Sequence, residues 1–302
     1  MRKEIEYQGA DYYLTLQEGE QGLVVTGCGG RATVVDVPPQ VENKPVVEIA
    51  KKAFLSRKNI KELVLPSTIR ILGDWAFAYC GKLEKVVLPG VPMEIGKSIF
   101  LNDGALCRIS CCEETGLHNW SKDVEFLLAA AVRELEAYYL LELAAAGKEE
   151  WLTKWDARLL SVMEEDDLEG YQKQVLCGEE DYGSTDLGLF LSNKRRKKAR
   201  LCMLRLQHAQ GLKEEFREYL TDYLRQHTKG CESEEAWLVL LQERAYDRES
   251  WELFTELGCV TKDNIEAMLK DIGEEYPEMK GYFLRYQAEK LGYEDFFAGL
   301  EL

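Results

Sequence analysis

A 23-residue repeat constrains the fold of this chain more than any other feature of its sequence. Phe54, Phe77 and Phe100 are separated by 23 residues, and four further apolar columns keep the same phase. A unit this short cannot bury its apolar face alone, so successive units must stack into a solenoid. The four columns are Ile49–Leu72–Ile95, Ile60–Leu83–Leu106, Leu63–Val86–Ile109 and Leu65-Pro66 with Leu88-Pro89.

Each unit contains a strand followed by a returning turn. Leu63 and Leu65 alternate with polar or smaller residues, which is the period of a strand with one buried face. Pro66 then ends the pairing because it has no N–H to donate. Residues 69–77 turn the chain back and place Leu72 and Phe77 inside, and Asp74–Phe77 suits a short helical turn.

The strand residues between the buried columns are predicted to form a protein-binding surface. Stacking places equivalent residues of neighbouring units side by side on the open face of the sheet. Among them, Lys85 and Arg108 are the cations expected to receive acidic partners. The predicted binding residues are Glu62, Val64, Lys85, Val87, Arg108 and Ser110.

Upstream of the repeat, two apolar runs predict a hairpin. Leu23–Thr26 and Val34–Val37 are its strands, and they lead into Val46–Ile49. Gly27–Gly30 is interpreted as the hairpin turn, because it lacks the lysine of a phosphate-binding loop.

The repeat resembles the BspA-like leucine-rich repeats over about residues 20–112. The third unit departs from the pattern, since Cys111-Cys112 stands where Leu-Pro is expected, and this predicts an array that ends near Cys112. The resemblance implies a repeat solenoid that binds proteins and provides no catalytic residues; many members are secreted or surface-attached. The matching segments are Ile49…Ala53-Phe54…Ile60…Leu65-Pro66, Leu72-Gly73…Ala76-Phe77…Leu83…Leu88-Pro89 and Ile95-Gly96…Phe100…Leu106.

From Ser121 onward the apolar period is that of helices. One long, nearly all-apolar helix is predicted from this point to Gly147, followed by helices at about 149–164, 168–177, 186–208 and 213–227. The remaining C-terminal residues predict two helix pairs that are related by a constant offset of 29 residues. These pairs weakly resemble ankyrin- or HEAT-like helical pairs. A helical solenoid and a compact bundle both fit. The offset relates Ala236, Leu240 and Phe254 to Ile265, Leu269 and Phe283.

The charge distribution divides the chain at the same place. The net charge of −16 comes almost wholly from residues 121–302, with 24 Lys+Arg against 39 Asp+Glu, while residues 1–120 have 14 against 15. We therefore predict an α+β chain with a repeat domain at 1–120 and an acidic helical domain at 121–302. Such an acidic half repels nucleic acids and anionic membranes.

One basic run lies within the acidic half, at residues 194–200. Two interpretations are open: it docks a phosphate-bearing or acidic partner, or it pairs with the chain's own acidic segments at 164–167 and 179–181. The second is favoured because nearby acids outnumber these cations.

No pattern typical of a metal, cofactor or catalytic site is evident. The nine cysteines are scattered without a CxxC, and the nearest cluster combines Cys107, Cys111 and Cys112 with His118. We predict no metal and no cofactor. An enzyme would most plausibly place a pocket at the junction of the two halves, near His118 and Trp120.

The predicted function is a non-enzymatic module that binds an unidentified protein, with no nucleic-acid or membrane partner. The alternatives are an enzyme with a pocket at the junction near His118 and an adhesin at the cell surface. The N-terminus lacks the apolar core of a signal peptide, and the apolar stretch at 126–146 carries Arg133 and three glutamates. The predicted location is therefore the cytoplasm, with a surface or secreted location as the alternative.

Overall fold

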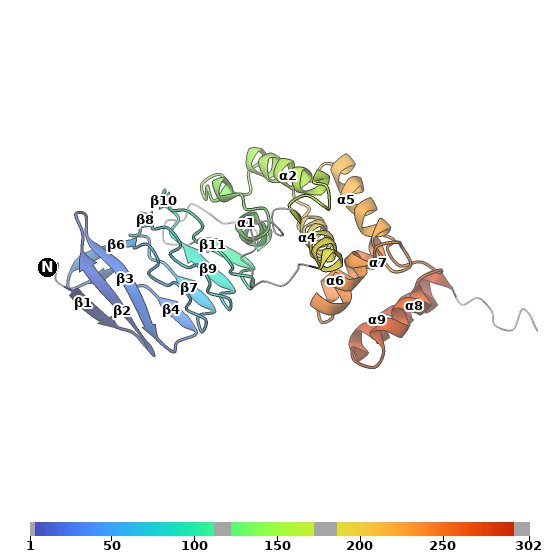
Figure 1. Cartoon of the computed structure of the whole chain (residues 1–302), viewed down its shortest axis with the longest axis horizontal. Coiled ribbons are helices and arrows are strands. Elements are labelled where there is room, and N and C mark those ends of the chain that lie inside the picture. Colours follow the sequence, from blue (N-terminus) through green and yellow to red (C-terminus); the bar gives the residue numbers. More distant parts are fainter. Residues whose placement is uncertain (1–3, 112–121, 172–185, 293–302) are drawn as a thin grey trace, which may run out of the picture. The chain divides into compact units, whose positions relative to one another are not determined.

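The computed structural model describes residues 4–111, 122–171 and 186–292, which form two compact units, Met1–Leu159 and Leu160–Leu302 (Figure 1). The first unit contains the strands and the second is helical, so the chain has the predicted α+β class. The division between units falls within helix α2 (Glu149–Glu164). The domain boundary near residue 120 lies outside the described residues and stays a prediction.

The first unit is built on two sheets. The larger has the order β1-β2-β3-β6-β8-β10, and the smaller has the order β11-β9-β7-β4. A short strand, β5 (Gln40–Val41), pairs with β6 beside the larger sheet. The larger sheet comprises β1 (Glu4–Gln8), β2 (Tyr12–Glu18), β3 (Leu23–Gly30), β6 (Lys44–Ile49), β8 (Ile71–Leu72) and β10 (Glu94–Ile95). The smaller comprises β4 (Val34–Asp36), β7 (Glu62–Val64), β9 (Lys85–Leu88) and β11 (Arg108–Cys111).

The repeat forms the predicted solenoid. β7, β9 and β11 pair in parallel with a constant offset of 23 residues, as do β8 and β10. Phe54, Phe77 and Phe100 stack with ring centroids 5.5 Å apart at both steps, and none is more than 2% exposed. The sequence columns are therefore the interior of the array, as the spacing predicted.

The prediction of a hairpin before the array is wrong. β3 pairs with β2 and β6 of the larger sheet, whereas β4 pairs with β7 of the smaller sheet. The run Gly27–Gly30 belongs to β3 rather than to a turn. A Cβ on Gly29 would lie 2.0 Å from the Tyr13 ring, so this glycine lets an aromatic side chain pack on the strand.

The long helix predicted after the array is also interrupted. Helix α1 (Lys122–Arg133) ends early, and a 3₁₀ turn, η2 (Tyr138–Leu140), follows it. The break includes Glu136, whose backbone is left-handed with φ of 51°. Arg133 donates a hydrogen bond of 2.9 Å to the Leu106 carbonyl, so the end of α1 is tied to the last repeat.

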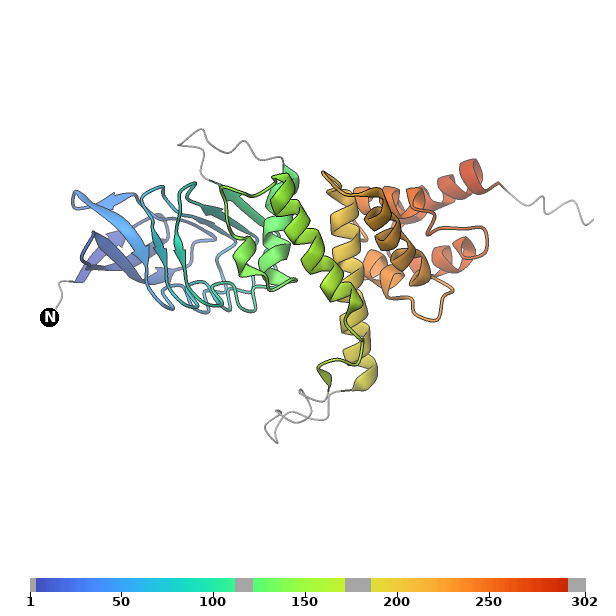
Figure 2. The ribbon, with the colours of Figure 1, turned by 90° about the horizontal axis from the view of Figure 1, so that it is seen from above.

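The second unit contains helices in the predicted segments. In the predicted 168–177 segment, residues 168–170 form a turn and residue 171 is helical, and the remainder lies outside the described residues. α4 packs against α5, α6 and α7, while α9 packs against α7 and α8 (Figure 2). The helices are α4 (Leu187–Gln207), α5 (Glu214–Gln226), α6 (Glu235–Glu243), α7 (Arg248–Glu256), α8 (Ile265–Ile272) and α9 (Pro277–Tyr286), followed by a π-helical turn, η3 (Gln287–Leu291).

The 29-residue offset corresponds to equivalent core positions in the two last helix pairs. Phe254 and Phe283 are fully buried, and both rings lie within 6.5 Å of the Trp237 ring. Side-chain hydrogen bonds join the pairs: the Asn264 amide donates to the carbonyls of Lys229 and Cys259. Among the helices of the described ranges, none is both long and apolar enough to cross a bilayer.

Candidate functional site: the open face of the smaller sheet

The smaller sheet brings the six predicted binding residues together. Its parallel register aligns Glu62, Lys85 and Arg108 in one row across the strands. Val64, Val87 and Ser110 form the next row on the same face. The residues between the rows, Leu63, Val86 and Ile109, point into the core and are at most 1% exposed. The sequence therefore predicted the geometry of this face; its role in binding stays a prediction.

Strand β4 adds two residues that sequence reasoning did not assign to this face. Val34 aligns with Glu62, and Asp36 aligns with Val64. Val34 is 50% exposed. The 23-residue columns do not extend to β4, because its offset from β7 is 28 residues. Val37-Pro38 nevertheless matches the Leu65-Pro66 strand ending of the next unit.

The charged residues of this face are already paired within the chain. The Lys85 ammonium lies 2.8 Å from the Glu62 carboxylate, and both side chains are about one-third exposed. The Arg108 guanidinium lies 2.9 Å from the Glu125 carboxylate of α1. The expectation that Lys85 and Arg108 attract acidic partners therefore needs correction, because each cation is neutralised by a neighbouring carboxylate.

Helix α1 limits the face on the β11 side. It packs beside β11, and the Arg108 guanidinium lies 5.6 Å from the Phe126 ring centroid. Ser110, which was expected to be exposed, is only 8% exposed, and its hydroxyl has no hydrogen-bond partner among the described residues. The accessible surface is thus formed by β4, β7 and β9. We call Val34, Asp36, Glu62, Val64, Lys85 and Val87 the open face.

The basic run on α4 pairs with the chain's own acids, as favoured from the sequence. Lys198 and Arg195 both contact the Asp167 carboxylate, at 2.9 Å and 2.7 Å. Lys194 lies 3.8 Å from Glu165, and Arg200 lies 3.1 Å from Glu243. The second acidic segment, 179–181, lies outside the described residues. The described contacts make this run a structural element of the second unit.

The nearest arrangement to a nucleophile and base is found between α5 and α6. The Ser233 hydroxyl lies 2.8 Å from His227 Nδ1 and donates to the Glu235 carboxylate. Here the serine bridges the histidine and the acid, whereas a catalytic triad has the histidine in the bridging position. Burial also lowers the pKa of His227, which is typical of a neutral structural histidine. This cluster fixes the α5–α6 connection.

Two cysteines of the first unit have raised pKa values. Burial raises the pKa of Cys28 to about 11 and that of Cys80 to about 12, so both stay protonated at neutral pH. Within the described ranges, no group of three or more His, Cys, Asp or Glu side chains could hold a metal ion. Cys112, His118 and Trp120, which the metal and enzyme alternatives invoked, lie outside the described residues.

Comparisons with solved structures identify bacterial repeat proteins. A T. pallidum leucine-rich repeat protein is 28% identical, with 34% of this chain and 52% of that chain covered at a TM-score of 0.31. A Bacteroides ovatus leucine-rich repeat protein is also 28% identical, and the match covers 34% of this chain and 28% of that chain at a TM-score of 0.30. A leucine-rich cell surface protein of Faecalibacterium prausnitzii is 21% identical, and the match covers 36% of this chain and 30% of that chain at a TM-score of 0.30. The chain spans about half the length of the first of these and less of the others, and no curated protein matches it.

The family comparison locates the repeats directly. A model of the BspA type leucine rich repeat region matches residues 40–121, which overlaps most of the resemblance predicted over about residues 20–112. Residues 40–121 of this chain are a BspA-type leucine-rich repeat region.

Proposed function

We propose that this chain is a non-enzymatic module that binds a partner protein through the open face. The observation that carries the proposal is the in-register alignment of β4, β7 and β9, which places Val34, Val64 and Val87 on one accessible surface. Leucine-rich repeat modules generally mediate protein–protein interaction, and BspA-type repeats usually lack catalytic activity. Stacked repeats supply such surfaces because each unit contributes equivalent side chains.

The chemistry of the open face indicates what kind of partner it fits. Its central ion pair, Glu62–Lys85, is internally satisfied, so a highly charged partner gains little from it. The exposed Val34 and the half-buried Val64 and Val87 provide the apolar surface whose burial stabilises a complex. We therefore expect a partner with an apolar ridge and few charges, and an affinity that changes little with ionic strength.

Site-specific photo-crosslinking in the native cell tests the location of the site. A photoreactive residue at Val64 or Val87 should trap the same partner protein. The matched controls are Val24 and Val47, which are also half-buried strand valines but lie on the larger sheet. Trapping from Val24 and Val47 with none from Val64 and Val87 would move the site away from the open face.

We also propose a cytoplasmic location, whereas the frequent surface association of BspA-like proteins supports the adhesin alternative. The described cysteines Cys28, Cys80, Cys107, Cys202, Cys231 and Cys259 are free thiols, as in proteins of reducing compartments. Fractionation with protease treatment of intact cells checks this: a chain digested from outside would instead support the adhesin alternative, with the same open face presented to an extracellular protein.

A further inference from the structure

The turns that join the larger sheet to the smaller one form a third layer of the array. Backbone hydrogen bonds link successive turns: the N–H groups of Lys52 and Trp75 donate to the carbonyls of Asp74 and Lys97, both at 3.0 Å. The side chains of the turns are therefore held in rows across the units, as they are on the sheets. The three turns are residues 50–59, 73–82 and 96–105.

These turns are basic, in contrast to the chain as a whole. They contain six Lys or Arg and two Asp, whereas the full chain has 38 Lys+Arg and 54 Asp+Glu. One of the two acids, Asp103, is buried. The other, Asp74, accepts a hydrogen bond from the backbone N–H of Lys97 at 2.8 Å. The turns therefore concentrate positive charge in one layer of an acidic protein.

The cations of the turns have no acidic partner within the described part of the chain. On the smaller sheet, by contrast, Lys85 and Arg108 each pair with a glutamate. Lys51 and Lys52 both lie over the Trp75 ring, at 4.7 and 5.2 Å from its centroid. Two like charges are thus held near one ring without a described carboxylate to offset their repulsion. An anion brought to this point relieves that repulsion.

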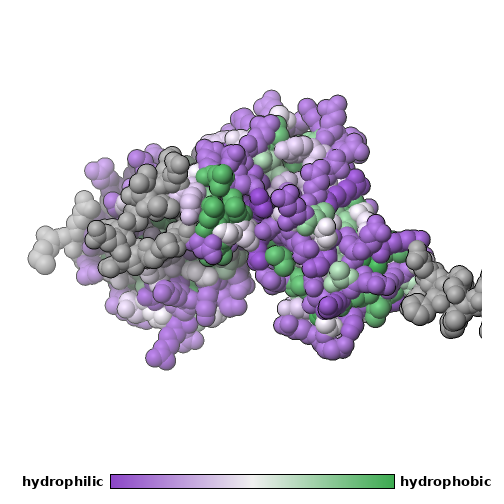
Figure 3. Space-filling view, turned by 45° about the vertical axis from the view of Figure 1, so that its right-hand side comes forward, coloured by the Kyte–Doolittle hydropathy of each residue, from purple (hydrophilic) through white to green (hydrophobic). Residues whose placement is uncertain are grey.

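Large apolar side chains are exposed in the same layer. Most of the surface visible in Figure 3 is hydrophilic, whereas Tyr79 and Leu101 are 46% and 38% exposed. The Tyr79 N–H donates to the Leu101 carbonyl at 2.7 Å, so the two residues are neighbours across successive turns. We call the following residues the turn face: Lys51, Lys52, Trp75, Tyr79, Lys97 and Leu101.

The backbone of the turns does not require its two aromatic residues. Trp75 and Tyr79 have left-handed backbones, with φ of 54° and 62°. Ser98 and Asn102 occupy the same positions in the next unit, with φ of 51° and 58°. Small polar residues therefore satisfy this conformation, which is unfavourable for bulky side chains. The rings are placed at the surface at a conformational cost, and this points to a role in recognition.

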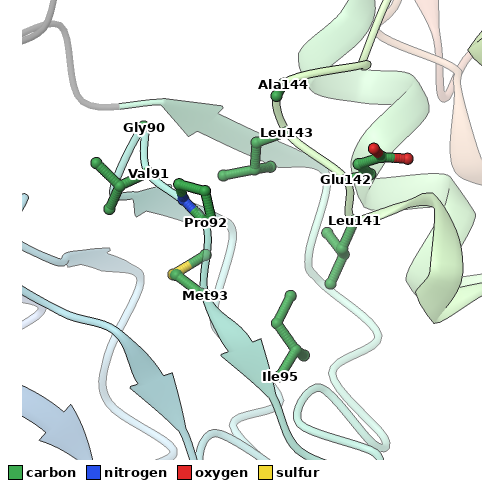
Figure 4. Close-up of a pocket in the computed structure, with 9 residues that line it drawn as sticks. All are labelled: Gly90, Val91, Pro92, Met93, Ile95, Leu141, Glu142, Leu143 and Ala144. Carbon is green, nitrogen blue, oxygen red and sulfur yellow. The ribbon is translucent and has the colours of Figure 1, made fainter.

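The first turn is remote from both ends of the array. It lies beside the end of β3, where Arg57 donates a hydrogen bond of 3.0 Å to the Gly30 carbonyl. β1 begins at the opposite end of the larger sheet, where Glu4 aligns with Gln17. The second and third turns separate the first from the end of the array, where a cavity of about 230 Å³ lies between β10 and residues 141–144 (Figure 4).

We propose that the turn face binds an acidic segment of a partner protein that carries apolar residues between its acids. Carboxylates of the segment pair with Lys51 and Lys52, and its apolar side chains pack on Trp75 and Tyr79. A protein segment is favoured over a polyanion, because the net charge of −16 repels nucleic acids and anionic membranes. This surface lies between the two sheets and goes beyond the proposed function, which places partner binding on the smaller sheet.

The probe is a fluorescent peptide with the sequence Asp-Glu-Leu-Asp-Glu-Phe-Asp-Glu. We expect saturable binding to the full chain by fluorescence anisotropy, with a Kd on the order of 10–100 μM at low salt. A peptide with Asn and Gln in place of the acids should bind at least about tenfold more weakly, because it lacks the carboxylates. A peptide with Ser in place of Leu and Phe should bind at least about threefold more weakly, because it buries less apolar surface.

Salt dependence distinguishes this surface from the open face. Raising NaCl from about 50 to about 300 mM should weaken peptide binding at least about fivefold, because salt screens exposed charges. The open face is expected to bind its own partner with an affinity that changes little over the same range, since its ion pair is already satisfied.

Substitutions of lysine locate the peptide on the chain. Lys51→Gln with Lys52→Gln should reduce the affinity at least about fivefold, because two cations are lost. The matched control is Lys148→Gln with Lys154→Gln, which changes the net charge equally at two exposed lysines outside the turns. This control should change the affinity by less than about twofold.

Substitutions of the two aromatic residues test the apolar contribution. Trp75→Ser and Tyr79→Asn copy the residues of the following unit, Ser98 and Asn102, and therefore suit the left-handed backbone. Each should weaken binding about two- to tenfold through the loss of apolar contact. Circular dichroism confirms that each variant is folded.

Four results would overturn the proposal. The first two are absence of binding to the unaltered chain at low salt and binding that survives Lys51→Gln with Lys52→Gln. The third is an equal loss of binding in the Lys148→Gln with Lys154→Gln control, which would assign the effect to net charge alone. The fourth is tighter binding of a DNA duplex or a phosphatidylserine vesicle that depends on Lys51 and Lys52, which would indicate a polyanion site.

Carbodiimide crosslinking of the free chain tests whether the turn face is available. We expect no crosslinks from Lys51 or Lys52 to acids of residues 121–302. Such crosslinks in high yield, within one molecule or between two copies, would show that the chain covers the turn face itself and would also overturn the proposal. None of these outcomes affects crosslinking from Val64 and Val87, so failure here is distinguishable from failure of the proposed function.

Discussion

The two units join their repeated elements by different means. In the array, neighbouring turns are linked by backbone hydrogen bonds at every strand, and the buried columns complete the interior. In the helical unit, side chains make the links: Asn264 bonds to carbonyls of the preceding segment, and Trp237 packs between Phe254 and Phe283. Backbone pairing leaves the outward valines of the array, Val34, Val64 and Val87, available for recognition, whereas the helical unit uses side chains to hold itself together.

The two units also differ in whether a cation accompanies a carboxyl group that is buried or half-buried. Asp103 in the array is 1% exposed and accepts a hydrogen bond from the Cys80 N–H, but its second oxygen has no partner in the described part of the chain. Asp167 in the helical unit contacts both Arg195 and Lys198. The array therefore buries an acid without a cation, and the helical unit compensates its acid with two.

The largest expected effect separates the two units directly. Phe77→Ala removes the middle ring of the Phe54–Phe77–Phe100 column and should destabilise the array by about 3–5 kcal/mol. Phe283→Ala should destabilise the helical unit by a similar amount. Hydrogen exchange with mass spectrometry should show loss of protection confined to the altered unit; loss in both units from either change would contradict their separate stabilisation.

The second prediction concerns the pH dependence of the array. Burial raises the pKa of Asp103 to about 7, partly offset by the Cys80 N–H, from an ordinary value of 3.8. The native carboxyl thus holds its proton up to higher pH than the unfolded one, so its contribution to stability falls as pH rises from about 4 to 7. Asp103→Asn should remove this decline and raise the free energy of unfolding at pH 8 by about 1–2 kcal/mol.

Urea titrations at pH 5 and pH 8, monitored by hydrogen exchange of the array, measure this difference in the free energy of unfolding. A variant that is no more stable than the unaltered chain at pH 8 would show that the carboxylate is solvated or paired in the native state.

Asp167 should have the opposite dependence. Its partial burial raises its pKa, but the hydrogen bonds from Arg195 and Lys198 lower the pKa by more than burial raises it. The pKa of Asp167 is therefore below its usual value. Its contribution is therefore present above about pH 4 and is lost as pH falls below that value. Asp167→Asn should cost the helical unit about 1–2 kcal/mol at pH 7 and less at pH 3. An equal cost at both pH values would exclude the ion pairs as its source.

The smallest expected effect tests the turns of the array. Ser56 has a left-handed backbone with φ of 61°, and Tyr79 and Asn102 repeat this conformation at 23-residue intervals. Ser56→Gly should stabilise the array by about 0.5–1 kcal/mol, because glycine adopts this conformation without strain. Ser67→Gly, at a position without positive φ, is the control and should give no gain; thermal unfolding compares the two.

Much of the array was predictable because the 23-residue period is imposed by the stacking itself. The columns, the parallel strands and the row of Glu62, Lys85 and Arg108 followed from it. The position of β4 did not, since its offset differs, and neither did the ion pair between Arg108 and Glu125. Periodicity describes contacts between equivalent units, whereas α1 meets β11 once, and no repeating pattern records a single contact.

The helical unit was less predictable for the same physical reason. Helix positions followed from apolar spacing, but the interruption after Arg133 did not, because the apolar pattern continues through the break. The pairing of the basic run with Asp167 was favoured on charge numbers alone. Which lysine and arginine reach that carboxylate depends on how α4 packs, which charge counting does not reveal.

The affinity of the chain for the partner trapped at the open face tests the central claim most directly. Val87→Glu places a carboxylate in the centre of that face and should weaken binding by about 30-fold or more, measured by titration calorimetry. Val47→Glu, on the larger sheet, should change the affinity by less than about threefold. Unchanged affinity for Val87→Glu together with a large loss for Val47→Glu would contradict the assignment of partner binding to the open face.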